Sequence, residues 1–195
     1  MHHSIAKLSL VAGLFAASSL AFAAAETYEI DNKHSFANFA IRHVVAKTSG
    51  TFSDVTGKLV IDKDNLANSS VDAKINVLSV NTSNEKRDEH IKKEEYLNAG
   101  KFGEIHFVSS KIVPTTASQG NVTGKLTING VTKEVTFPFA VLGFGKDPWG
   151  GVRTGIEAKT IIKASDYGYG YGWGKPGSPV GDDVEVTLLI EGIRK

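Results

Sequence analysis

The sequence predicts an all-β, antiparallel fold of about eight or nine strands, arranged as a sandwich or a barrel, with one short helical insertion. Three observations support this fold class. Apolar residues alternate with polar residues along most of the chain, turn-forming residues separate the alternating runs, and a single segment has a helical pattern. Period-two alternation with one apolar face is typical of half-buried strands, and closely spaced consecutive strands pair antiparallel.

The strands are expected wherever the alternation is regular. The predicted strands are residues 27–30, 37–43, 58–62, 71–77, 104–113, 122–128, 135–141, 156–162 and 184–190. Asn129-Gly130 separates two of these runs and is a strong hairpin signal. The stretch Gly143–Gly151, which contains Asp147-Pro148, ends another strand.

The helical insertion is expected over residues 84–97. Thr82 and Glu85 have the spacing of a capping box, with Thr82 as the N-cap residue. Asp88–Lys92 and Glu89–Lys93 are pairs of opposite charge four residues apart. Because the segment has few large apolar residues, we expect it to lie across the sheet or over a barrel mouth instead of forming a core.

The N-terminus has the pattern of an export signal. Lys7 precedes an apolar run from Leu8 to Leu20, and Ala21-Phe22-Ala23 then offers a cleavage site. We expect residues 1–23 to be a signal peptide and 24–195 to be one mature domain. Cleavage after Ala25 and an uncleaved anchor are the alternatives.

Composition excludes several classes of function. Removing residues 1–23 lowers the formal net charge from +1 to 0, so nucleic acid is not expected as a partner. The absence of cysteine excludes disulfides, thiolate catalysis and cysteine-ligated metal. We expect a protein that is soluble once processed and not inserted stably in a membrane.

The polar residues do not form a recognisable catalytic or metal-binding motif. His34, His43, His90 and His106 lack the short spacing of a metal site, so no metal and no cofactor is expected. Asp88 and His90 offer an acid and a base, but the sequence has no nucleophile elbow, zinc-protease motif or phosphate loop. From the pattern alone, a packed core and a ligand-binding cavity remain open alternatives for the barrel interior.

Several motifs, in order along the mature chain, are similar to those of the YceI-like family of polyisoprenoid-binding proteins. They are Asp31-x-x-His34-Ser35-x-x-x-Phe39-x-Ile41-x-His43, Gly50-Thr51-Phe52, Arg87-Asp88-x-His90, Ile105-x-Phe107, Gly124-x-Leu126-Thr127-Ile128-Asn129-Gly130-Val131-Thr132-Lys133 and Asp147-Pro148-Trp149-Gly150-Gly151. The sequence departs from the family pattern at Gly103-Glu104, where proline is common, and near Lys163, where arginine is common. The aromatic–glycine tract Tyr167–Gly174 is a further departure.

The resemblance implies an extended, lipocalin-like barrel in the periplasm that holds a polyisoprenoid, a quinone or its precursor, or a fatty lipid, without catalysis. Taking the more apolar face as the inner one, we expect the chain-lining residues to be Phe39, Ile41, Ile75, Val77, Phe107, Leu126, Ile128, Val135, Phe137, Ile156, Ile162, Val186 and Leu188. Trp149 and Trp173 are expected at the barrel ends, where they could contact a ligand or only cover the core. The polar residues at family motif positions, expected to hold the helix against the barrel, are His34, His43, Arg87, Asp88 and His90.

Two other functions remain open at this stage. A hydrolase or isomerase could act on a lipid in the same cavity, using His90 with Asp88. A barrel with a solid core could serve a surface interaction. The oligomeric state is also open, with a homodimer as one alternative.

Overall fold

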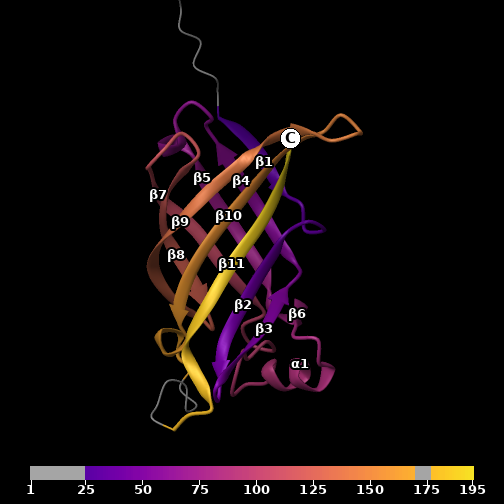
Figure 1. The fold of residues 1–195 in the computed structure, drawn as a ribbon, viewed down its shortest axis with the longest axis vertical. Helices are drawn as coiled ribbons and strands as arrows, with labels where there is room; N and C mark the ends of the chain where they lie inside the picture. The colour runs from indigo at the N-terminus through magenta and orange to yellow at the C-terminus, as the bar shows by residue number, and fades with distance from the viewer. Residues whose placement is uncertain (1–24, 170–176) are drawn as a thin grey trace, which may run out of the picture.

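The computed structural model describes residues 25–169 and 177–195, and these form an elongated antiparallel barrel (Figure 1). The elements are β1 Glu26–Ile30, β2 Phe36–His43, β3 Ala46–Phe52, β4 Val55–Ile61, the 3-10 turn η1 Leu66–Asn68, β5 Ser70–Asn76, the 3-10 turn η2 Val77–Ser79, β6 Val80–Asn81, α1 Glu85–Ile91, β7 Glu104–Pro114, β8 Gln119–Ile128, β9 Val131–Lys146, β10 Val152–Lys163, the 3-10 turn η3 Ala164–Tyr167 and β11 Val180–Arg194. Within the described residues, no helix is both long and apolar enough to cross a bilayer.

A ring of eight strands closes the barrel in the described part of the chain. The order is β1-β4-β5-β7-β8-β9-β10-β11, and the ring closes where β1 pairs with β11. Every strand pair is antiparallel, as the sequence predicts.

Strand β11 has two partners along one edge. Its C-terminal part pairs with β1, where Glu29 lies opposite Ile193. Its N-terminal part pairs with β2, where Ile41 lies opposite Val184. Strands β2, β3 and β6 therefore continue the wall beyond the end of β1, and α1 lies beside them at the lower end of Figure 1.

The predicted strands are all present, with ends that shift by a few residues. The Asn129-Gly130 turn is also confirmed, because both residues adopt positive φ angles of 50° and 73° between the paired Ile128 and Val131. Strands β3 and β6 were not predicted. Strand β3 is mostly polar and only its last residue, Phe52, is buried, so it has no alternation to detect.

The helix prediction was wrong in its limits and its cap. Helix α1 covers Glu85–Ile91, and hydrogen-bonded turns follow it. Its N-cap is Asn84, whose side chain accepts a hydrogen bond from the Arg87 amide at 3.0 Å. Thr82 instead precedes the cap and is bound by the side chains of Arg87 and Asp88 from the helix. The spacing of Thr82 and Glu85 is that of a capping box, but Thr82 does not act as the cap.

Candidate functional site

The inner wall of the barrel is apolar but incompletely packed. Phe39, Ile156 and Leu188 point inward and contact the core, yet each stays half-buried. Strand pairing places such residues side by side, because Phe39 lies opposite Val186 and Leu188 lies opposite Ala158. These half-buried side chains therefore form an apolar inner surface that the neighbouring side chains do not cover completely.

Most of the predicted chain-lining residues belong to the hydrophobic clusters of the interior, whereas Ile41 and Val186 are placed on the inner face only by the strand alternation that they share with Phe39 and Leu188. Those that stay half-buried are Phe39, Ile41, Ile75, Phe107, Val135, Ile156, Ile162, Val186 and Leu188. Those that are buried are Val77, Leu126, Ile128 and Phe137. Val77 begins η2 instead of continuing the alternation of β5, because the strand ends at Asn76. Contact of these residues with a ligand stays a prediction.

The end of the barrel nearest the C-terminus is filled. Tyr28, Leu59 and Thr154 are 0%, 4% and 2% exposed there. Gly192 leaves room for this packing, because a Cβ at that position would lie 2.9 Å from the Tyr28 Cβ. A chain-like ligand has no space at this end. The sequence pattern places Tyr28 in a strand but carries no sign that it fills the barrel.

Two tyrosines close part of the opposite end. Tyr167 and Tyr169 are buried against Leu126 and Ile128, and the Asn129 side chain donates a hydrogen bond to the Tyr167 carbonyl at 3.0 Å. Burial raises the pKa of Tyr169 to about 12, so its hydroxyl stays protonated at neutral pH. Tyr167 ends η3, and the following Gly168 has φ 78°, so this part of the aromatic–glycine tract is not extended. Trp173 lies outside the described residues.

A polar groove of about 710 Å³ opens beside β3. It forms because β3 pairs with β6 only at Thr51 and Phe52, which leaves the rest of that edge unpaired by β6. Its lining includes the inward-pointing Phe39 and, on the other side, Arg87 of α1. The lining residues are Asn38, Phe39, Lys47, Thr48, Ser49, Gly50, Thr51, Asn81, Thr82, Ser83 and Arg87. The groove thus brings the apolar side chain of Phe39 and the charged side chain of Arg87 to one place at the surface.

Helix α1 is held at this groove by a clamp on Thr82. The Asp88 carboxylate accepts hydrogen bonds from the Thr82 amide at 2.8 Å and from the Thr82 hydroxyl at 2.6 Å. Arg87 donates to the Thr82 hydroxyl and to its carbonyl, each at 2.7 Å. The buried Thr82 directly follows β6, so these bonds tie a short, weakly apolar helix to the sheet.

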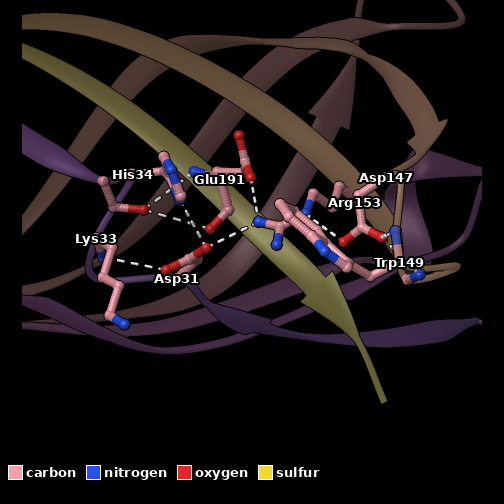
Figure 2. A network of polar contacts seen from close by, with 9 residues as sticks. Asp31, Lys33, His34, Asp147, Trp149, Arg153 and Glu191 are labelled. Carbon is pink, nitrogen blue, oxygen red and sulfur yellow. Dashed lines mark hydrogen bonds and ion pairs between the residues drawn. The ribbon is translucent and has the colours of Figure 1, made fainter.

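A second polar network lies on the outer surface at the filled end (Figure 2). Arg153 of β10 donates to Asp31 after β1, to Asp147 in the β9–β10 turn and to Glu191 of β11. His34 bonds to Asp31 at 2.8 Å, and this contact, followed by Arg153, holds the pKa of Asp31 at about 2. The network joins loops and strands that are distant in sequence, and sequence reasoning missed it as a unit.

The β9–β10 turn presents Trp149 to solvent. Asp147 accepts hydrogen bonds from the amides of Trp149 and Gly151, and Arg153 holds Asp147 in turn (Figure 2). Trp149 is 86% exposed. As predicted, it lies in a loop at a barrel end, but this is the filled end and its side chain is on the exterior.

The same network contains a group of residues with metal-ligand chemistry. One donor atom each from Asp31, His34 and Glu191 lies within 4.8 Å of the others. Arg153 already places its guanidinium between the two carboxylates, with 2.8 Å to Asp31. A positive charge from the protein thus occupies the position that a cation would take, so the group fits an ion-pair network better than a metal site.

The five polar residues at family motif positions do not gather at one place. Arg87 and Asp88 hold the helix, as predicted. His34 lies in the network at the filled end, His43 is exposed at the last residue of β2, and His90 bonds to the Tyr96 hydroxyl at 3.0 Å. His34 does not hold the helix, because it precedes β2 and lies at the other end of that strand from His43. His90 lies on α1 and contacts Tyr96, in the segment that follows the helix.

Comparisons with known proteins agree on one family. Residues 28–192 match the YceI-like domain. A relative from Ectopseudomonas mendocina, called a UPF0312 protein, is 40% identical over 176 residues, which cover 89% of this chain and 90% of that protein.

Solved structures show the same fold. BcnA of Burkholderia cenocepacia is similar with a TM-score of 0.75 and 26% identity, over 83% of this chain and 98% of that chain. A polyisoprenoid binding domain from Saccharophagus degradans is similar with a TM-score of 0.64 and 16% identity, over 86% of this chain and 98% of that chain. At that identity the second likeness supports the fold alone.

Proposed function

Because the chain belongs to the YceI-like family, we propose that it is a periplasmic carrier that holds a polyisoprenoid or a similar long-chain apolar lipid inside its barrel. A quinone or its precursor falls within this ligand class. The observation that carries the proposal is the set of half-buried apolar side chains on the inner wall. The Saccharophagus degradans domain, described as polyisoprenoid binding, shares the fold in which we place this ligand.

Chain burial supplies the binding free energy in this proposal. Each CH₂ group moved from water into the apolar interior contributes about 0.8 kcal/mol before ordering costs. A chain of many such groups needs few polar contacts, which fits an inner wall of Phe, Ile, Leu and Val. The filled end limits how far the chain can extend, so we expect the ligand to enter from the side of α1.

The candidate acid Asp88 and the candidate base His90 both have hydrogen-bond partners within the protein, and this favours binding over catalysis. Asp88 is engaged by Thr82, and His90 bonds to Tyr96. Both groups therefore stabilise the helical segment in this arrangement. A lipid-modifying enzyme would convert its ligand with turnover, whereas a carrier returns it unchanged.

Native mass spectrometry of the full-length expressed protein, followed by solvent extraction, tests the carrier proposal. We expect a bound apolar lipid whose chemical identity survives repeated loading and extraction. A product that accumulates with time would support the enzyme instead.

A matched pair of variants tests the location of the ligand. Val186 points inward and is half-buried, whereas Thr187, the next residue of β11, points outward. Val186→Trp should fill the interior beside it and reduce lipid occupancy at least ten-fold, and Thr187→Trp should leave it unchanged. Full occupancy in a folded Val186→Trp protein would refute binding inside the barrel.

Export is tested by the mature N-terminus. We expect N-terminal sequencing of protein from a periplasmic fraction to begin at Ala24, or at Glu26 for the alternative cleavage. Intact protein that retains Met1 in a membrane fraction would contradict the localisation.

A further inference from the structure

The side chain of Tyr167 is buried inside the barrel, at the end opposite the filled end. Tyr167 is the last residue of η3, which follows β10, and β10 ends in the lower part of the barrel in Figure 1. The residue is 2% exposed and belongs to one buried cluster with Leu126 and Ile128 of β8. Half-buried residues of β7, β9, β10 and β11 pack against this cluster, and they include Phe107, Val135, Ile162 and Val184. Because five consecutive strands of the wall contribute to it, the cluster lies within the barrel.

The Tyr167 hydroxyl has no hydrogen-bond partner in the described part of the chain. Among the described residues, only two buried side-chain polar atoms lack such a partner, the hydroxyl oxygen of Tyr167 and the Oδ1 atom of Asn129. The two residues are in contact, because the Asn129 side chain donates a hydrogen bond to the Tyr167 carbonyl at 3.0 Å. Buried polar groups are nearly always hydrogen-bonded, and an unsatisfied one destabilises the fold. Both exceptions at one end of the interior therefore point to a polar contact with a bound molecule.

The Tyr167 hydroxyl is a neutral hydrogen-bond donor. Burial, followed by the charge of Asp166, raises the pKa of Tyr167 above the ordinary value of tyrosine. The proton therefore stays on the oxygen at neutral pH, and the group can donate one hydrogen bond to an acceptor.

The surroundings of the hydroxyl favour an acceptor without charge. A phosphate or carboxylate would lose its hydration in the apolar cluster at a large cost in free energy, whereas a carbonyl oxygen loses much less. The cations on the adjacent strands do not offset this cost, because Lys133 of β9 pairs with Asp166 and Lys163 of β10 pairs with Asp183. Both lysines are also partly exposed, so their charge is directed to the surface. The acceptor that fits is a neutral carbonyl oxygen.

The cluster around Tyr167 continues into the apolar inner wall. Ile162 lies opposite Val184, and Val184 lies opposite Ile41, which is one of the expected chain-lining residues. These side chains are half-buried, so they can shift when a ligand enters and let one end of it reach the hydroxyl. Since the other end of the barrel is filled, a lipid along the wall would direct its apolar chain towards the filled end and its polar end towards η3.

We propose that the Tyr167 hydroxyl is the polar contact of the bound lipid and donates a hydrogen bond to a neutral carbonyl oxygen at one end of its chain. The proposal rests on the carrier function, and it adds the orientation of the lipid and the class of head group that the interior accepts. The hydroxyl lowers the stability of the empty protein, and in return it selects a carbonyl-bearing lipid over a plain hydrocarbon.

A matched pair of isoprenoid probes tests this contact. Phytone is an isoprenoid ketone, and the saturated hydrocarbon with the same carbon skeleton lacks only its carbonyl oxygen. Lipid-free, full-length protein is loaded with an equimolar mixture, and native mass spectrometry measures the occupancy by each probe. Wild type should prefer the ketone about five-fold, as expected for one neutral hydrogen bond, and Tyr167→Phe should abolish the preference while keeping the ring.

Stability and infrared spectra separate this contact from a structural role. Lipid-free Tyr167→Phe should unfold at the same or a higher temperature than wild type, because it loses a hydroxyl that has no partner. The carbonyl stretch of bound phytone should lie at lower wavenumber in wild type than in Tyr167→Phe. Tyr169→Phe is the control, because Tyr169 is 8% exposed in the same cluster but has an interaction partner, and this variant should keep the ketone preference.

The outcomes distinguish this contact from the carrier function. Equal occupancy by both probes in wild type, or a ketone preference that survives in Tyr167→Phe, would overturn the contact and leave the carrier function standing. A lower unfolding temperature for Tyr167→Phe would show that the hydroxyl is already satisfied in the empty protein, which also contradicts the proposal. Displacement of phytone by geranylgeranyl phosphate would overturn the restriction to neutral head groups. Failure to bind either probe would refute the carrier function itself.

Discussion

The filled end of the barrel and the inner wall beyond it are built from similar residue types but packed differently. At the filled end, Tyr28, Leu59 and Thr154 exclude solvent almost completely. On β10 and β11, beyond this end, Ile162, Val186 and Leu188 are also apolar and on the inner face but stay half-buried. The first region is packed as a core, and the second presents the apolar surface that the proposed ligand would contact.

The largest effect is expected from truncating leucine in each region. Leu59→Ala removes a side chain that is 4% exposed and should lower the free energy of unfolding by about 2–5 kcal/mol. Leu188→Ala in lipid-free protein should cost less than half as much, because its side chain is only half-buried. Urea unfolding of both variants checks this. Equal losses would mean that the interior is packed throughout.

A smaller effect is expected from the helix clamp beside the half-buried region. Asp88→Ala removes the acceptor of two Thr82 hydrogen bonds and should destabilise the local structure of α1 by about 1–3 kcal/mol. Hydrogen exchange over residues 85–91 should accelerate, and lipid release should become faster. Glu89→Ala is the matched control, because Glu89 lies on the same helix with its side chain 68% exposed. Equal protection from hydrogen exchange in Asp88→Ala and wild type would show that the hydrogen bonds between Asp88 and Thr82 do not stabilise α1.

The ion-pair network predicts that the filled end is sensitive to acid. The contact with His34, followed by Arg153, lowers the pKa of Asp31 from 3.8 to about 2. A lowered pKa in the folded state contributes stability above the unfolded value, and that contribution disappears as pH falls from about 4 towards 2. In Asp31→Asn, the free energy of unfolding should therefore decrease less between about pH 4 and pH 2 than it does in the wild type. An identical acid unfolding curve for Asp31→Asn would assign the acid sensitivity to other groups.

The smallest effect is expected at Trp149. Its side chain is 86% exposed on the outer surface, so Trp149→Ala should change the free energy of unfolding by less than about 0.5 kcal/mol. Because the filled end separates it from the half-buried inner wall, lipid occupancy should also stay unchanged. A reduced occupancy measured by native mass spectrometry would show that the ligand reaches this loop.

The sequence predicts those features that leave a local pattern. Alternation locates the barrel strands and the inward direction of residues such as Phe137, and Asn129-Gly130 locates a turn. Strand β3 was not predicted because Ala46–Phe52 is mostly polar, and because one of its sides is paired only at Thr51 and Phe52 it needs no apolar alternation. The helix is overestimated because its favourable charge spacing continues beyond Ile91, where the backbone turns away.

The site is harder to predict than the fold because it depends on contacts between distant segments. The sequence does not show whether the neighbours of an isoleucine bury it, as they do at Ile61, or leave it half-buried, as they do at Ile162. Arg153 meets three carboxylates from three separate parts of the chain. Only Asp31-x-x-His34 and the Asp147 turn appear as motifs, and nothing in the sequence joins them to Arg153.

The pairing of β1 with β11 makes the order of folding depend on the completed chain. Arg194 bonds to Glu26, which is 168 positions earlier, so the first strand meets its closing partner only when the last residues are present. Contacts of such separation carry a large loop-closure entropy and slow the folding rate. Until closure, the free edges of β1 and β11 can pair with other chains. Loss of residues 180–195 would therefore leave an open sheet with unpaired strand edges, which is prone to aggregation.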